Sequence, residues 1–323
     1  MVVARLKFRH GVHPPEHKEL TAGLKVRRMP FPREVLLPLS QHAGRPAIPI
    51  VKPGDRVERG DKIAESDGFI SVPMHATAAG TVADIELHPH PMGDFQPAIR
   101  IEVDPNSAQA PRPRMVPEWE GLTPPQIVEA VQQAGVVGLG GAAFPTHVKL
   151  TPPKEGQLDT LVINGCECEP YLTTDHRTMV DYPERVQLGV RIMMRCLGVK
   201  RALIGIERNK PDAIEIIEKT LPSDLDVEVM PLTVKYPQGA EKMLIKAVLD
   251  REVPSGKLPL DVGVVVQNVA SVATIAEVFE TGLPLIERIV TVTGNGIRKP
   301  ANLIVPVGTR LRDLLDACGG LTD

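Results

Sequence analysis

Two hydrophobic patterns alternate along the chain. Between residues 31 and 105, short apolar runs are separated by glycine–aspartate pairs such as Gly54-Asp55, and this pattern predicts short β-strands joined by turns. Between residues 135 and 285, apolar runs of strand length alternate with segments whose apolar residues recur at the helical period. Regular alternation of strand and helix predicts an α/β fold with a largely parallel sheet that is covered on both faces.

A helix with a well-marked start precedes this alternation. Thr123 can cap it, Pro124 suits its first turn and Gln126 completes a capping box, while Gly135 ends it. The pattern that follows predicts strands at 161–163, 202–206, 227–230 and 262–266, and helices at 183–197, 211–221, 239–249 and 270–280.

The two ends of the chain follow other patterns. Residues 1–30 are polar and carry three histidines, His10, His13 and His17, without a fixed helical spacing, which favours a solvated or packed arm over a metal site. From residue 286, two apolar runs joined by a glycine-rich turn precede a short helix, as at the start of a β-grasp module. We therefore predict an N-terminal arm (1–30), a barrel-sandwich module (31–105), an α/β domain that opens with a proline-rich linker (106–285) and an incomplete β-grasp module (286–323).

Composition excludes several classes of function. Aromatic residues make up only 3% of the 323 residues, which argues against a nucleic-acid platform of stacked rings. Lys and Arg total 37 against 40 for Asp and Glu, so the charge does not point to DNA or an anionic membrane surface. Four cysteines do not make a disulfide scaffold. No window has the length of a membrane span. We expect a protein of the reducing cytosol that reaches a membrane only by docking onto another protein.

The barrel-sandwich segment has a recognisable glycine pattern. V-x-x-G-D-x-V-x-x-G-D-x-I-A, followed by A-x-x-x-G-x-V, resembles the lipoyl- and biotinyl-type barrel. Carrier members of that family have a lysine at the hairpin tip, whereas here the tip is Glu65-Ser66-Asp67-Gly68-Phe69. We therefore expect a structural or docking module rather than a swinging arm.

Candidate chemistry lies in three polar stretches at the ends of predicted strands, where open α/β sheets bind ligands. The first stretch runs from Gly138 to Lys149. Its Gly138, Gly140 and Gly141 allow close backbone approach and offer N–H groups to a phosphate, and Lys149 adds a positive charge. Phe144 is suited to stacking on a planar ligand. An ordinary glycine-rich turn with Phe144 in the core is the alternative.

The second stretch, Asn164 to Tyr171, follows the strand at 161–163 directly. Asn164, Glu167 and Glu169 are groups of the kind that bind ring nitrogens and ribose hydroxyls. Cys166 and Cys168 are one residue apart, whereas a [4Fe–4S] cluster needs four thiolates, commonly with two-residue spacings. We therefore predict no metal within these residues and leave open a reactive thiol pair.

The third stretch is split between two strand ends. Lys235-Tyr236-Pro237-Gln238-Gly239-Ala240-Glu241 precedes a helix, and Gln267-Asn268 ends the strand at 262–266. Both segments could simply cap helices. The sequence has no G-x-S-x-G, H-E-x-x-H, Walker-type or G-x-G-x-x-G motif.

Taken together in this order, the motifs resemble RnfC, the C subunit of the Rnf electron-transport complex, over essentially the whole chain. The matching segments are Gly11–Lys18, Gly138–Leu150, Asn164–Tyr171, Lys235-Tyr236-Pro237 and Gln267-Asn268-Val269. The glycine and acidic loops also resemble the NADH- and FMN-binding flavoprotein subunit of respiratory complex I. The resemblance implies a Rossmann-like α/β domain that binds FMN and a nicotinamide dinucleotide, between a barrel-sandwich module and a truncated β-grasp module of the SLBB type.

The resemblance also implies roles for individual residues. Gly138, Gly140, Gly141 and Lys149 would hold the phosphate and ribityl side of FMN. The flavin would be lined by Asn164, Glu167, Tyr236, Gly239, Gln267 and Asn268, and the nicotinamide nucleotide would meet Phe144, Glu169 and Glu241. Hydride transfer depends on stacking and orientation more than on acid–base groups, which agrees with the lack of a catalytic triad.

The sequence departs from the family pattern in places. Leu139 stands where the complex I relatives carry Arg, and Cys166 and Ala240 stand where they carry acids. The family continues beyond the last residue here, with two C-x₂-C-x₂-C-x₃-C-P motifs for [4Fe–4S] clusters, so the chain is either a fragment or a shortened relative.

In the whole complex, the resemblance implies ferredoxin:NAD⁺ oxidoreduction coupled to ion translocation. The chain would sit peripherally on the cytoplasmic face of the membrane, with the other Rnf subunits as partners and ferredoxin as an indirect one. Two alternatives stay open at this point: a docking scaffold that has lost its flavin, and an NADH-dependent cobalamin reductase that shares the glycine loop.

Overall fold

The computed structural model describes residues 8–112, 118–151 and 158–322. Their contacts group them into two compact units, which are described one at a time. Unit 1 contains the described residues up to Lys25 together with Lys149–Ala276, and unit 2 contains Val26–Val148 and the residues from Glu277 onward. The four-segment division expected from the sequence stays a prediction.

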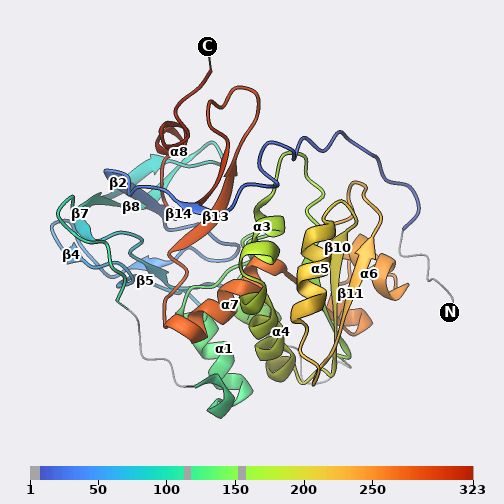
Figure 1. The fold of residues 1–323 in the computed structure, drawn as a ribbon. Helices are drawn as coiled ribbons and strands as arrows, with labels where there is room; N and C mark the ends of the chain where they lie inside the picture. Colours follow the sequence, from blue (N-terminus) through green and yellow to red (C-terminus); the bar gives the residue numbers. More distant parts are fainter. Residues whose placement is uncertain (1–7, 113–117, 152–157, 323) are drawn as a thin grey trace. The chain divides into compact units, whose positions relative to one another are not determined.

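Unit 1 is built on a four-stranded parallel sheet (Figure 1). Its strands are β9 (Thr160–Gly165), β10 (Arg201–Glu207), β11 (Asp226–Leu232) and β12 (Val264–Asn268), in the order β11-β10-β9-β12. All three pairings are parallel, because each strand is followed by a helix that returns the chain to the opposite edge. The predicted parallel α/β sheet is therefore confirmed.

Helices cover this sheet. They are α3 (Thr174–Asp181), α4 (Pro183–Leu197), α5 (Pro211–Thr220), α6 (Glu241–Leu249) and α7 (Val269–Thr281). Figure 1 shows β10 and β11 between α5 and α6. Leu244 and Ile245 of α6 pack against Val162, Leu203 and Val266, one residue from each of three neighbouring strands. All five side chains are almost completely buried, so hydrophobic burial fixes α6 on this face.

The barrel-sandwich module of unit 2 consists of two small sheets. One contains β2 (Glu34–Pro38), β8 (Phe95–Val103), β7 (Gly80–Pro89) and β4 (Arg56–Val57), and the other contains β3 (Ile48–Pro49), β5 (Lys62–Glu65) and β6 (Met74–His75). Val35, Ile63, Val82, Ile99 and Ile101 are completely buried in a shared core. In β2, the buried Val35 and Leu37 alternate with half-buried residues, and in β8 the buried Ile99 and Ile101 alternate with Arg100 and Glu102, the pattern of strands with one buried face.

A third sheet in unit 2 joins two distant parts of the chain. It contains β1 (Arg27–Arg28), β14 (Ala301–Pro306) and β13 (Glu287–Val292), with α8 (Leu311–Ala317) packed on it through Leu314. β13 and β14 pair antiparallel, as expected for the β-grasp start, and β1 pairs parallel with β14. The sequence placed Arg27–Arg28 in the arm, because two exposed arginines carry no strand pattern.

The remaining helices are short except for α1 (Pro124–Gln133), whose predicted capping box is present. The Thr123 amide donates to Gln126 Oε1 at 2.9 Å. The short elements are η1 (Trp119–Gly121), α2 (Thr146–Lys149) and η2 (Pro259–Val262). None of the described helices combines the length and the apolar character that a membrane crossing requires.

Gly189 of α4 gives a test of helix packing in unit 1. A Cβ at this position would lie 2.1 Å from Val272 O of α7, so only glycine allows the two helices to approach. Gly→Ala in a helix normally stabilises a protein by about 1 kcal/mol, but we expect Gly189→Ala to lower the free energy of unfolding by about 1–3 kcal/mol through overpacking. Urea unfolding measures this change in the free energy of unfolding. Gly23→Ala, at a position with open space, is the control, and a neutral or stabilising Gly189→Ala would contradict the packing.

Candidate functional site

Polar side chains gather at the carboxyl edge of the sheet in unit 1. Asn164 of β9 is paired with Asn268 of β12, and Gln267 is the residue before it. The Asn164 side chain donates to Gly239 O at 2.8 Å, and its oxygen accepts from the Cys166 amide at 3.1 Å. Asn164 therefore ties the acidic loop to the loop before α6, and the fold brings together two of the three polar stretches expected from the sequence.

Asn268 caps α7, which is the alternative role that the sequence left open for this residue. Its Nδ2 donates to Asp175 Oδ2 at 2.7 Å, and its Oδ1 accepts from the Ala270 amide at 2.9 Å at the start of α7. Its side chain is only half-buried. Capping therefore fixes the orientation of a side chain that still borders solvent at the strand end.

Lys149 contacts one further predicted residue, Glu241, and a carbonyl of β12. Its Nζ donates to Glu241 Oε1 at 2.8 Å and to Val266 O at 2.9 Å. The side chains of Lys149 and Glu241 are 32% and 38% exposed. An ammonium and a carboxylate thus lie together at the end of β12, and both remain accessible from solvent.

Gly239 is required for a close approach of two loops. A Cβ there would lie 2.5 Å from Cys166 O. The Gly239 amide donates to Cys168 Sγ at 3.3 Å, and Cys166 Sγ contacts Gly205 O at 3.5 Å. Burial raises the pKa of both thiols, so the neutral thiol is favoured in each case and the pair is unsuited to nucleophilic chemistry.

The two glutamates of the acidic loop have different surroundings. Glu167 is buried, and its Oε1 accepts from the Asp175 amide at 2.8 Å and from Thr174 Oγ1 at 2.9 Å. Its carboxylate therefore caps α3, a favourable place for a negative charge. Glu169 is exposed. Apolar periodicity missed α3, because that helix is mostly polar.

The glycine loop lies in unit 2. The Gly138 amide donates to Phe144 O at 2.8 Å, which closes the loop at its base. Gly140 and Gly141 are exposed. Gly141 has a φ of +124°, and nothing lies within 4 Å of where its Cβ would be. The tip of the loop thus presents open backbone of the kind that suits a phosphate, while Phe144 is half-buried.

Barrel-sandwich and β-grasp residues support the glycine loop within unit 2. The Ala43 amide donates to Ala143 O at 3.1 Å, and Arg288 Nη2 donates to Leu139 O at 3.3 Å. His147 Nε2 lies 2.8 Å from Phe69 O, and its ring meets the Phe69 ring edge-on at 5.6 Å. Phe69 belongs to the hairpin tip that carries lysine in carrier proteins, so here that tip has a structural contact.

The residues at the carboxyl edge of unit 1 fit a flavin nucleotide, because half-buried amides and a solvent-accessible ammonium occupy the strand ends. A cavity of about 200 Å³ in unit 1 lies beside the acidic loop, and Glu167, Cys168 and Tyr236 line it. Among the described residues, no group of three or more His, Cys, Asp or Glu side chains could hold a metal ion.

Comparison with protein families gives three matches along the chain. Residues 6–106 match the RnfC barrel sandwich hybrid domain, residues 131–277 match the Nuo51 FMN-binding domain, and residues 289–323 match the SLBB domain. These matches confirm the predicted order of a barrel-sandwich module, an α/β domain and an SLBB-type module.

Similar curated proteins cover almost the whole chain. It is 44% identical over 316 residues to the C subunit of the proton-translocating ferredoxin:NAD(+) oxidoreductase complex of Clostridium ljungdahlii. It is 45% identical to the Na(+)-translocating counterpart of Acetobacterium woodii and 42% identical to the C subunit of the ion-translocating oxidoreductase complex of Rhodobacter capsulatus. Each match covers 98% of this chain and, in the same order, 69%, 71% and 61% of the relative.

Among solved structures, the air-oxidised NAD+-reducing [NiFe]-hydrogenase has a similar fold. The TM-score is 0.54 at 23% sequence identity, over 62% of this chain and 40% of the hydrogenase chain. At this identity the likeness concerns the fold alone.

His42 precedes Ala43, whose amide donates to the glycine loop, and it gives a pH test of this support. Its Nε2 accepts from the Val72 amide at 3.3 Å, and burial lowers its pKa. The unfolded chain therefore takes up a proton near pH 6.5 before the folded protein does, so stability is complete above that pH and declines as the pH falls. We expect His42→Gln to lose less unfolding free energy than wild type between pH 7.5 and 5.5. His90→Gln, at a half-buried position before an exposed turn, is the control, and equal declines in all three proteins would contradict this role.

Proposed function

Because the chain belongs to the RnfC family, we propose that it binds FMN and a nicotinamide dinucleotide and transfers hydride between them. Electrons would then pass to or from Fe–S clusters of the complex. The observation that carries the proposal is the set of polar groups at the carboxyl edge of the sheet, inside the segment that matches an FMN-binding domain. Parallel α/β sheets bind ligands at this edge.

The resemblance to the family supplies the role that we propose for each residue. In unit 1, Asn164, Glu167, Tyr236, Gly239, Gln267 and Asn268 would line the flavin, and Lys149 would offer its ammonium to the phosphate and ribityl side. In unit 2, the open backbone of Gly138, Gly140 and Gly141 would hold the phosphate. The nicotinamide nucleotide would meet Phe144, Glu169 and Glu241.

The protein's contribution is binding and orientation. Bound FMN supplies a centre that accepts hydride and passes electrons on singly. Asn164 and Asn268 are already oriented by hydrogen bonds within the fold, so little side-chain freedom is lost when they meet a ligand. Burial raises the pKa of the Cys166 and Cys168 thiols, which disfavours a competing thiolate nucleophile. Acid–base groups are not required for this step, because stacking and distance control hydride transfer.

The setting of this reaction belongs to the same proposal. We propose that the chain is a peripheral member of a membrane complex that couples ferredoxin:NAD⁺ oxidoreduction to ion movement, on the cytoplasmic side. The names of its relatives support this setting. Two [4Fe–4S] clusters would take part, as the resemblance to the family implies.

FMN uptake tests the cofactor assignment. We expect the purified chain to take up FMN with quenching of flavin fluorescence. Lys149→Met should weaken FMN binding by about 10–100-fold, because a hydrogen bond to a charged group is lost. Lys219→Met is the matched control, since Lys219 forms an exposed ion pair with Glu215 on α5. A folded chain that takes up no FMN, yet captures the other members of the complex, would favour the docking-scaffold alternative.

NADH oxidation tests the substrate assignment. We expect NADH to bleach the absorbance of bound FMN under anaerobic conditions. Glu169 is exposed on the acidic loop, so Glu169→Gln should raise the NADH concentration that gives half-maximal bleaching rate and leave FMN affinity unchanged. Stopped-flow absorbance measures both the half-maximal NADH concentration and the FMN affinity. Equal loss of FMN and NADH binding in this variant would show that Glu169 does not discriminate between them.

A further inference from the structure

The N-terminal arm crosses the acidic loop of unit 1 in a regular series of contacts. The Tyr171 amide donates to Glu16 O at 2.9 Å, and the His17 ring stacks on the Tyr171 ring with centroids 4.8 Å apart and an interplanar angle of 15°. Thr173 Oγ1 donates to Thr21 Oγ1 at 2.9 Å, with both side chains buried. Residues 16–21 therefore follow the loop from its tip to the start of α3.

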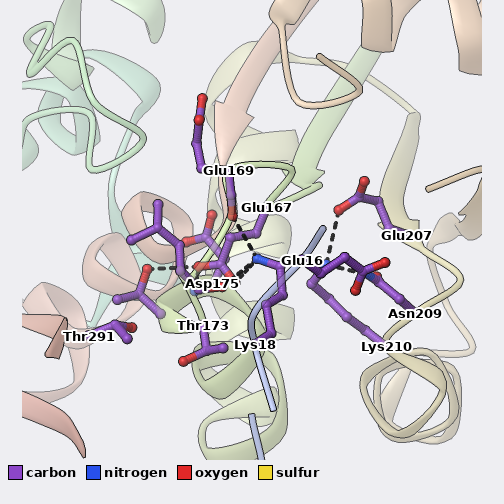
Figure 2. Close-up of polar contacts among 12 residues, drawn as sticks. Glu16, Lys18, Glu167, Glu169, Thr173, Asp175, Glu207, Asn209, Lys210 and Thr291 are labelled. Carbon is purple, nitrogen blue, oxygen red and sulfur yellow. Dashed lines mark hydrogen bonds and ion pairs between the residues drawn. The ribbon is translucent and has the colours of Figure 1, made fainter. Parts of the chain in front are cut away.

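Lys18 is the centre of these contacts. Its side chain is only 9% exposed, yet it carries an ammonium group. Figure 2 shows this group directed into the acidic loop. Nζ donates to Glu169 O at 2.9 Å and to Leu172 O, and it lies 3.9 Å from Glu167 Oε2. One cation thus binds both ends of the loop tip and balances the carboxylate that caps α3.

The same arm holds the second loop of the site. The amides and carbonyls of Val12 and Tyr236 exchange hydrogen bonds of 2.9 and 2.8 Å. Lys235 Nζ donates to His10 O at 3.1 Å and lies 3.7 Å from the centre of the Phe8 ring. Gly11 is needed here, because a Cβ would lie 2.9 Å from Tyr236 O. The arm therefore contacts both of the loops that carry Glu167, Glu169 and Tyr236.

Buried charge beneath the loops reinforces this arrangement. Glu207 and Lys210 form an ion pair at 3.0 Å in which both side chains are 1% exposed. Burial lowers the pKa of Lys18, and the Glu167 carboxylate counteracts that effect. Removing one partner of a buried pair leaves an uncompensated charge, which is costly. The contacts of Lys18 therefore resist opening of the loop.

We propose that the N-terminal arm is a brace for the cofactor site and that Lys18 is its positioning residue, holding the acidic loop in the conformation that receives the flavin and the nicotinamide. Lys18 acts through the backbone carbonyls of Glu169 and Leu172 and the carboxylate of Glu167, not through the ligands. The benefit for binding rests on the function proposed above, whereas the ordering of the loop does not.

Hydrogen exchange of the FMN-free chain tests the brace directly. In Lys18→Met the side chain keeps most of its apolar stem and loses its hydrogen bonds. We expect the amides of residues 166–173 to exchange at least about tenfold faster than in wild type, with protection of β9 and β10 retained. Lys25→Met is the matched control, because Lys25 is exposed on the same arm. His17→Ala removes only an exposed ring and should give a smaller effect in the same direction, which keeps the test informative if Lys18→Met does not fold.

FMN titration of the same variants completes the test. We expect FMN affinity to fall about tenfold in Lys18→Met and less in His17→Ala, with Lys25→Met unchanged. Unchanged exchange of residues 166–173 in the folded variants would overturn the brace. Faster exchange with unaltered FMN affinity would overturn the positioning role. If wild type itself bound no FMN, the proposed function would fail, and the exchange measurement would still decide whether the arm orders the loop.

Discussion

Peptide groups that leave the end of a parallel strand have no ladder partner, and every such group that is buried must find one elsewhere. In unit 1 this constraint is met by a few side chains rather than by more secondary structure. Asn164 binds the loop before α6, Glu167 binds the start of α3, and Lys18 binds the carbonyls between them. The shape of the candidate site therefore depends on these polar contacts as much as on the apolar core below them.

These contacts bury charged side chains, and each buried charge lies near a side chain of opposite charge. Glu207 is paired with Lys210, and Glu167 lies near Lys18. A buried pair adds little net stability compared with apolar residues, but breaking it costs about 3–5 kcal/mol. The consequence is a loop with one strongly preferred conformation. Under the function proposed above, such rigidity would favour catalysis, because hydride transfer requires that the two planar ligands be oriented.

In unit 2, the barrel-sandwich module and the β-grasp sheet stabilise the glycine loop. Its glycine loop is exposed at the tip and fixed at the base by the Gly138–Phe144 hydrogen bond. Residues of the barrel-sandwich module and of the β-grasp sheet donate to its carbonyls. The hairpin tip that bears a lysine in carriers of the same fold contacts His147 instead. The barrel-sandwich module, whose sequence resembles lipoyl- and biotinyl-type barrels, thus contributes a structural support for the glycine loop.

Local residue patterns are enough to predict the periodic part of this protein. Apolar repeats located β9 to β12 and most of the helices that cover them, and the Thr123 and Gln126 pattern located a helix start, because those signals lie within a few neighbouring residues. Ordered motifs identified the family. Three features are visible only in the folded protein: the contact of Lys18 with the acidic loop, the pairing of Arg27 and Arg28 with β14, and the polar helix α3. These features depend on partners that are distant in the chain or lack apolar periodicity, so no local pattern of residues specifies them.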